Sequence, residues 1–231
     1  MNVSVIIPVY NEERYIRHII EAVNSIKIDK EIIMIDDGST DKSLKIAKEI
    51  NFNNLVLLSN DKNMGKGFSI RKALKYVKNE IIIIQDADLE YDPNDYYKLL
   101  EPFKNKNISV VYGSRFLGIK RIIYSKGINY NFRALINLFL TKIFNFLNDQ
   151  KITDAHTCYK VFRKELLKDL NLKEKGFSFC PEFSTKISVL GHKIHEVPIS
   201  YNPRSKKEGK KIAFSDGFQA IRTLLQYRFF D

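Results

Sequence analysis

Short apolar runs alternate with amphipathic segments along the first half of the chain. Val3–Val9 is an almost continuous apolar run, which is typical of a strand buried on both faces, and apolar residues then recur at helical spacing from Ile16 to Ile26. The alternation predicts strands at 3–9, 31–35, 55–58, 81–84 and 108–112, and helices at 12–26, 41–50, 65–77 and 93–103. This order favours an α/β fold with a mostly parallel central sheet flanked by helices, in which ligands bind at the carboxyl ends of the strands.

Two carboxylates follow the most apolar of these strands. Ile81–Ile84 is succeeded by Gln85 and then by Asp86-Ala87-Asp88. In an extended backbone the side chains of residues 86 and 88 point to the same side, and the small Ala87 leaves room for a ligand. Because carboxylate oxygens suit Mg²⁺ or Mn²⁺, this segment predicts a metal site that carries a diphosphate; a solvated turn is the alternative.

Polar residues also follow the other predicted strands. Strand 3–9 leads into Tyr10-Asn11-Glu12, strand 31–35 into Asp36-Asp37-Gly38, and strand 108–112 into Gly113-Ser114-Arg115. Each cluster alone is compatible with a turn, whereas their meeting at one sheet edge indicates a nucleotide site. There we expect Asp37 to accept a hydrogen bond from a base or ribose, Tyr10 to flank the base, and Glu12 to bind ribose hydroxyls.

A glycine-rich segment, Asn63-Met64-Gly65-Lys66-Gly67, opens the predicted helix 65–77. It has neither the P-loop nor the GxGxxG spacing, which argues against a kinase or a dinucleotide-binding enzyme. Two glycines around a lysine at a helix N-terminus favour a nearby anion, and a plain turn with a solvated lysine is the alternative.

Composition adds a preference for anionic partners. The 231 residues are 44% apolar and carry a net charge of +11, which indicates a folded domain that binds a nucleotide sugar, phosphate groups, an acidic membrane surface or nucleic acid. Cys158 and Cys180 lack the spacing of a zinc site or a disulfide scaffold. The chain enters a strand without a signal-peptide pattern, so a cytoplasmic location is expected.

Two segments of the second half are candidates for membrane contact. Residues 135–147 are apolar nearly all round, and residues 221–230 mix bulky apolar side chains with arginines. Neither reaches the length of about 18 uncharged apolar residues expected of a spanning helix. Each segment predicts either a core helix or an interfacial helix whose cations meet anionic lipid.

Ordered motifs run along nearly the whole chain. They lie at residues 3–12, 36–41, 63–67, 86–88, 113–115, 154–162 and 196–201, and end in Pro203-Arg204 followed by Glu208-Gly209-Lys210-Lys211-Ile212. Together they resemble the family 2 glycosyltransferases, most closely the dolichol-phosphate mannose synthase branch in its short form without a membrane tail. The resemblance implies a GT-A fold, a nucleotide-diphosphate sugar such as GDP-mannose or UDP-glucose as donor, Mg²⁺ or Mn²⁺, and a polyprenyl or dolichyl phosphate acceptor.

The resemblance also implies roles for individual residues. The residues expected to hold the nucleotide and its diphosphate are Pro8, Tyr10, Glu12, Asp37, Ala87 and Lys210. Asp86 and Asp88 would hold the metal, with Glu90, where the branch often has Gln, as a further ligand. Arg115 and Arg204 are expected near the diphosphate or the acceptor phosphate and act in catalysis with the two aspartates, and Arg133 is a further candidate for the acceptor phosphate.

The acceptor decides which other residues matter. A polyprenyl phosphate is already anionic and needs only cations to seat it. A sugar hydroxyl of a glycan or glycolipid, the alternative acceptor, needs a carboxylate base, for which Glu182 and Asp154 are the candidates. A nucleic-acid-binding domain is disfavoured because the basic residues do not form a stripe interleaved with aromatic residues.

These expectations describe one glycosyltransferase domain over residues 1–231. Residues 1–115 form its nucleotide-binding half and residues 116–231 its acceptor-binding half. We expect a peripheral protein on an anionic membrane surface at the cytoplasmic face, and a membrane-protein partner subunit is left open.

Overall fold

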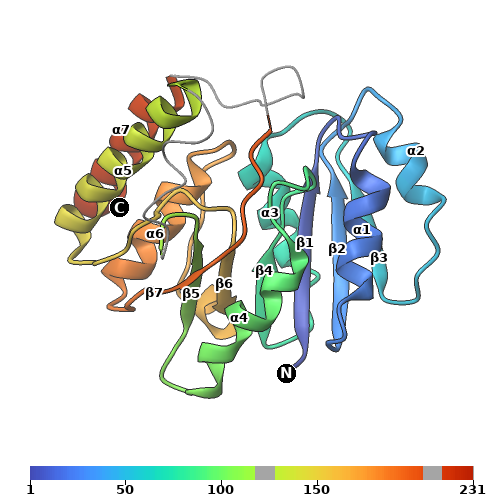
Figure 1. The fold of residues 1–231 in the computed structure, drawn as a ribbon, viewed down its shortest axis with the longest axis horizontal. Coiled ribbons are helices and arrows are strands. Elements are labelled where there is room, and N and C mark those ends of the chain that lie inside the picture. The colour runs from blue at the N-terminus through green and yellow to red at the C-terminus, as the bar shows by residue number, and fades with distance from the viewer. Residues whose placement is uncertain (118–127, 205–214, 231) are drawn as a thin grey trace.

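The strands of the computed structural model form one seven-stranded sheet (Figure 1). The structure describes residues 1–117, 128–204 and 215–230, with the side chains of residues 128–133, 215 and 216 outside that description. The strands are β1 Val3–Val9, β2 Lys30–Asp36, β3 Leu55–Ser59, β4 Ile81–Ile84, β5 Val110–Ser114, β6 Lys160–Arg163 and β7 His195–Pro198. Their order in the sheet is β3-β2-β1-β4-β6-β5-β7.

Most neighbouring strands run in the same direction. β1 is parallel to β2 and β4, β2 to β3, and β5 to β7, which confirms the predicted mostly parallel sheet. β6, which the alternation pattern did not predict, lies antiparallel between β4 and β5. Since β4 and β5 both oppose β6, their carboxyl ends lie at the same edge of the sheet.

The helices follow the predicted order with shorter bounds. They are α1 Ile16–Ser25, α2 Ser43–Lys48, α3 Lys66–Leu74, α4 Tyr96–Leu100, α5 Ile128–Asn148, α6 Phe179–Val189 and α7 Ser215–Phe229. The prediction of one helix at 93–103 was wrong, because the 3₁₀ turns Pro93–Asp95 and Glu101–Lys104 precede and follow α4. Pro102 has no amide hydrogen with which to continue the α-helical ladder.

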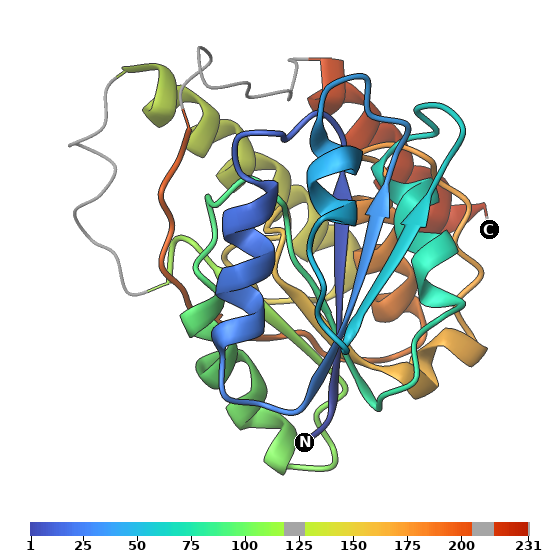
Figure 2. The ribbon, with the colours of Figure 1, turned by 90° about the vertical axis from the view of Figure 1, so that its right-hand side faces the viewer.

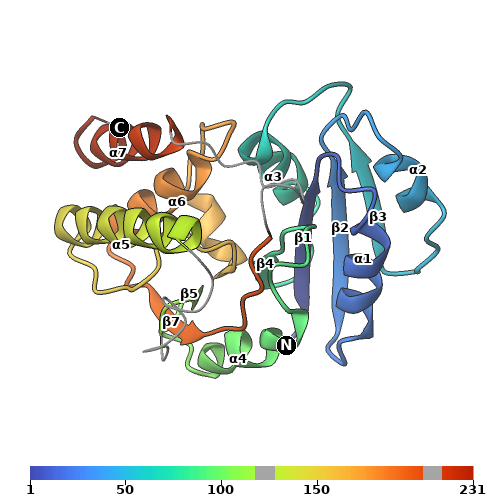
Figure 3. The same ribbon diagram turned by 45° about the horizontal axis from the view of Figure 1, so that its top comes forward.

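Helices cover both faces of the sheet. Seen near its edge in Figure 2, the sheet has α1 on one side and α3 on the other. Helices α5, α6 and α7 pack against one another, and Figure 3 shows them grouped beyond β4, away from α1 and α2. Among the helices that the structure describes, none is long and apolar enough to cross a bilayer.

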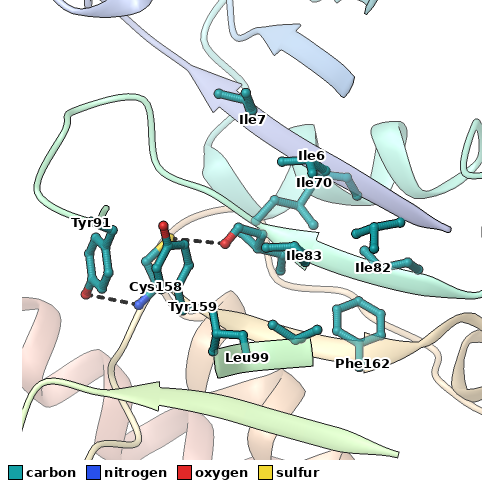
Figure 4. Packing of buried hydrophobic residues seen from close by; sticks show 14 of the residues in the cluster. Ile6, Ile7, Ile70, Ile82, Ile83, Tyr91, Leu99, Cys158, Tyr159 and Phe162 are labelled. Carbon is teal, nitrogen blue, oxygen red and sulfur yellow. Dashed lines mark hydrogen bonds between the residues drawn. The ribbon is translucent and has the colours of Figure 1, made fainter. Parts of the chain in front are cut away.

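The core holds the end of β4 in place. Ile82 and Ile83 of β4 pack with Ile70 of α3 and Phe162 of β6, and all four are fully buried (Figure 4). Just beyond them the Tyr159 and Tyr96 hydroxyls donate to the buried Gln85 Oε1, at 2.7 and 2.8 Å. The strand end from which Asp86 and Asp88 project is therefore fixed by packing and by hydrogen bonds.

Candidate active site

Carboxylates from separate strand ends meet at one edge of the sheet. Glu12 follows β1, and Asp86, Asp88 and Glu90 follow β4. Arg204 joins them, because its Nη1 lies 2.8 Å from Glu12 Oε2 and its Nη2 lies 2.9 Å from Asp88 Oδ2. The structure thus brings Glu12 and Asp88 from two of the predicted strand ends together through Arg204.

The two aspartates of the 86–88 motif differ in their surroundings. Burial acts to raise the pKa of Asp86, but the ammonium of Lys66, whose Nζ lies 2.5 Å from Asp86 Oδ1, holds it below its usual value. Burial, together with the charges of Asp86 and Glu90, raises the pKa of Asp88 to about 7, although Arg204 opposes the rise. Asp88 is therefore the more readily protonated of the two carboxylates.

Lys66 is the site residue that the sequence assignment missed. It lies at the start of α3, where Phe68 N donates to Lys175 O at 2.9 Å and a Cβ on Gly65 would lie 2.5 Å from the same carbonyl oxygen. Gly65 has φ 95°, a conformation that favours glycine. Loop packing thus brings Lys66 to Asp86, and the lysine between two glycines was the available signal.

Glu90 connects the motif to the segment that carries Arg204. Its two carboxylate oxygens accept hydrogen bonds from the Tyr201 hydroxyl at 2.8 Å and from Arg204 N at 2.7 Å, and its carbonyl accepts from Asn202 N at 2.9 Å. Leu89, with φ 58°, turns the chain between Asp88 and Glu90. In this structure Glu90 positions Arg204, a role different from the predicted metal ligation.

Asp37 organises the glycine-rich loop. Its Oδ1 accepts from Asn60 Nδ2 at 2.7 Å and Met64 N at 2.9 Å, and its Oδ2 accepts from Gly65 N at 2.8 Å. A carboxylate has about four acceptor positions, and the described residues fill three of those of Asp37. Asp37 therefore couples the predicted nucleotide contact to the loop that presents Lys66.

Arg115 and Asp154 form a buried pair. Arg115 Nε and Nη2 lie 2.7 and 2.8 Å from the two oxygens of Asp154, and the guanidinium lies 5.2 Å from the ring centre of Tyr201. Burial acts to raise the pKa of Asp154, but Arg115 outweighs it and holds the pKa below its usual value. A carboxylate held in this way is a poor proton acceptor, which disfavours Asp154 as a catalytic base.

The remaining predicted residues fall into three groups. Pro8 and Tyr10 are half-buried at the end of β1 and just beyond it, and Ala87 is buried between the two aspartates. Glu182 lies inside α6 and is fully buried. Its carboxylate accepts hydrogen bonds from Lys173 N at 2.6 Å and from Glu174 N at 2.9 Å, and so anchors a loop. The structure therefore does not support Glu182 as a base. Lys210 and the side chain of Arg133 lie outside the described residues.

A divalent metal fits the carboxylate pair. Among the residues with described side chains, no group of three His, Cys, Asp or Glu could hold a metal by itself. Mg²⁺ commonly binds through one or two protein carboxylates and takes its other ligands from substrate phosphates and water. The carboxylate oxygens of Asp86 and Asp88, two positions apart beyond β4, match that chemistry.

Comparison with known protein families matches residues 4–170 to the model described as Glycosyl transferase family 2. The low-salt glycan biosynthesis hexosyltransferase Agl6 of Haloferax volcanii is 29% identical over 225 residues, which are 96% of this chain and 52% of that protein. The chain thus spans about half the length of that relative. The dolichol-phosphate mannosyltransferase of Pyrococcus furiosus is 27% identical over 91% of this chain and 59% of its own.

A third relative and a solved structure extend the comparison. The dolichyl-phosphate beta-glucosyltransferase ALG5A of Trichomonas vaginalis is 29% identical over 98% of this chain and 73% of its own. Glucosyl-3-phosphoglycerate synthase from Mycobacterium tuberculosis, solved with Mn²⁺, UDP and glucosyl-3-phosphoglycerate, superposes with a TM-score of 0.72 at 19% identity, over 98% of this chain and 79% of that one. This likeness confirms the predicted GT-A fold.

Proposed function

Because the chain is a member of glycosyl transferase family 2, we propose that it transfers a hexose from a nucleotide-diphosphate sugar to a polyprenyl phosphate. The observation that carries the proposal is the pair Asp86 and Asp88 at the sheet edge, with Lys66 and Arg204 beside it. Two relatives named for dolichyl-phosphate mannosyl and glucosyl transfer support the acceptor class. GDP-mannose and UDP-glucose are therefore the first donors to test.

The donor would bind across the carboxyl ends of β1, β2 and β4. Tyr10 and Pro8 would flank the base, and Glu12 and the remaining acceptor position of Asp37 would bind the base or ribose. Asp86 and Asp88 would hold Mg²⁺ or Mn²⁺, which supplies positive charge to the diphosphate as it leaves. Lys66 pairs with Asp86 and Arg204 pairs with Asp88. Both cations would therefore lie close to the phosphate oxygens that the metal binds.

The chain's own task is to place two anionic groups in line. An oxygen of the acceptor phosphate forms a bond to the anomeric carbon, the bond from that carbon to the β-phosphate oxygen breaks, and the nucleoside diphosphate leaves with the electron pair. The acceptor is already ionised, so no base is needed. Fixed cations lower the repulsion between the two phosphates, and Arg115, Arg204, Lys210 and Arg133 are the candidates.

The acceptor places the reaction at a membrane surface, because a polyprenyl chain partitions into a bilayer. We propose the cytoplasmic face, on which a peripheral protein meets both the lipid and the nucleotide sugar. The hydroxyl-acceptor alternative lacks a free base among the predicted candidates, since Asp154 pairs with Arg115 and Glu182 binds backbone amides.

The test is a transfer assay with separated products. Purified protein receives labelled GDP-mannose or UDP-glucose, Mn²⁺ and a short-chain polyprenyl phosphate, and the extracted lipid is treated with mild acid. The proposal predicts label in an acid-labile lipid product, formed by the wild type and lost in Asp88→Asn. Label found only in added glycan acceptors would contradict the acceptor assignment.

A further inference from the structure

Two helices of the acceptor-binding half carry the same outward pattern. The exposed side chains are Leu135, Phe139, Lys142 and Phe146 on α5, and Phe218, Arg222, Leu225 and Phe229 on α7. In both helices they recur at positions i, i+4, i+7 and i+11, which places them in one stripe along the helix. Each stripe combines three large apolar side chains with one cation, and Phe146 and Phe218 are 89% and 70% exposed.

The two stripes belong to neighbouring helices. Helices α5 and α7 pack against each other and against α6, and Figures 1 and 3 show both at the outer side of the molecule. Their opposite sides are buried, through Phe144 of α5 and through Leu224 and Tyr227 of α7. We call these two exposed stripes together the α5–α7 face.

A shallow depression runs along the α7 part of this face. It is lined by Phe218, Ile221, Arg222, Leu225, Gln226 and Phe230, and Phe230 is 83% exposed. Single exposed apolar residues are ordinary on a protein surface, whereas apolar side chains gathered along two adjacent helices mark an interaction surface. Core packing therefore accounts for the inner sides of these helices and leaves the α5–α7 face unexplained.

Charge identifies the kind of partner. None of the described side chains of α5 or α7 is acidic, whereas Lys142, Arg222 and Arg228 are exposed. A second copy docked through the same face would bring like charges together, and no described side chain of either helix is a carboxylate that could pair with them. A bilayer with anionic headgroups offers both an apolar interior for the phenylalanines and negative charge for the cations.

We propose that the α5–α7 face docks the protein onto a lipid bilayer that carries anionic headgroups. The phenylalanines enter the boundary between headgroups and acyl chains, and Lys142 and Arg222 lie at headgroup level. The proposal deepens the proposed function, on which it rests for its purpose, by naming the surface that meets the acceptor's membrane. The binding itself can be measured without donor, metal or turnover.

Fluorescence offers a clean test, because the sequence contains no tryptophan. Phe139→Trp and Phe229→Trp each report on one stripe, and Tyr76→Trp, at a tyrosine 47% exposed beyond α3, is the matched control. With phosphatidylglycerol-containing vesicles, both stripe variants should show a blue shift and protection from an aqueous quencher, and the control should show neither. The absence of a shift in both stripe variants would overturn the proposal.

Charge and apolar variants separate the two contributions. Lys142→Gln with Arg222→Gln should weaken partition onto the anionic vesicles about thirtyfold, since each cation near such a surface contributes about one factor of five. Phe139→Glu with Phe229→Glu should abolish flotation with the vesicles. Self-association of the wild type that is lost in this double glutamate variant, without vesicle binding, would instead assign the face to a second copy.

The transfer assay keeps this proposal separate from the function. If the α5–α7 face docks on lipid, the double glutamate variant should still glycosylate a short-chain acceptor dispersed in detergent. Vesicle binding without transfer by the wild type would leave the docking intact and contradict the proposed function. Transfer by the wild type without vesicle binding would support the proposed function and contradict the docking.

Discussion

The two halves of the molecule position their site residues in different ways. In residues 1–115, Glu12, Asp86 and Asp88 follow parallel strands directly, so the sheet itself places them. In the second half, Arg204 lies in a segment without regular structure that Glu90 holds, and Asp154 is held through Arg115. Residues 1–115 thus depend on strand geometry to place these side chains, and the second half depends on ion pairs between distant residues.

This difference gives the halves complementary charges at the site. The first half contributes a group of carboxylates together with Lys66, and the second contributes the guanidinium of Arg204, which bridges Glu12 and Asp88. Changes to a carboxylate should therefore affect donor binding, whereas changes to Arg204 should affect how the halves act together.

Asp88→Asn should have the largest effect. Loss of one anionic oxygen donor removes metal-dependent stabilisation of the leaving diphosphate, and we expect kcat/KM for transfer to fall about a thousandfold. Asp92→Asn is the matched control, because Asp92 is exposed and its Oδ1 accepts hydrogen bonds from Asn94 N and Nδ2 at the start of the following turn. Equal losses in both variants, or full activity in Asp88→Asn, would refute the assignment of Asp88.

Gly38→Ala tests the rigid frame of residues 1–115. Gly38 has φ 68°, and an added Cβ would lie 2.7 Å from Asn63 N, so we expect the free energy of unfolding to fall by about 3 kcal/mol. Gly217→Ala, within α7 and with open space around the added Cβ, should instead raise it by about 0.5 kcal/mol. Urea denaturation of both variants measures the difference; equal stabilities would contradict the described loop packing.

Arg204→Lys tests the bridge between the halves. A lysine ammonium cannot reproduce the two-pronged contact with Glu12 and Asp88, so we expect kcat/KM to fall about thirtyfold while the fold is retained. Arg17→Lys, in the exposed pair with Glu49, should change it by less than about twofold. Unchanged kinetics in Arg204→Lys would show that the bridge has no role in turnover.

His156 should make stability depend on pH in the second half of the chain. Burial, with the nearby charge of Lys160, lowers the pKa of His156 from 6.5 to about 4, and no described residue forms a hydrogen bond with its buried Nε2. The unfolded chain therefore binds the proton more readily, and the contribution of His156 to stability should be lost as the pH falls below 6.5.

Between pH 7 and pH 5.5 we expect the His156 contribution to the free energy of unfolding to fall by about 1 kcal/mol. Asp88, whose pKa of about 7 changes stability in the opposite direction, is present in both proteins, so His156→Gln should remove this fall from the pH dependence relative to the wild type, measured by urea denaturation at each pH. His192→Gln, at a half-exposed histidine beyond α6, is the matched substitution control. A slope that His156→Gln does not change would refute the prediction.

The local sequence pattern was sufficient to predict the strand ends. It was insufficient to predict which residues contact the side chains at those ends. The isoleucine run of β4 predicted both the strand and the position of Asp86 and Asp88. No periodicity links Lys66 to Asp86 or Arg204 to Glu12, because these contacts depend on loops that meet only in the folded chain. For the same reason Glu182 was a candidate base by sequence, while the structure uses it to bind the amides of a loop.

The most direct test of the donor site is calorimetric titration of the protein with UDP and with GDP, with and without Mn²⁺. We predict that one nucleoside diphosphate binds in the presence of Mn²⁺, that binding weakens strongly without the metal, and that Asp88→Asn loses the metal-dependent part. Nucleotide binding of equal strength with and without Mn²⁺, or unchanged in Asp88→Asn, would contradict a donor site built on Asp86 and Asp88.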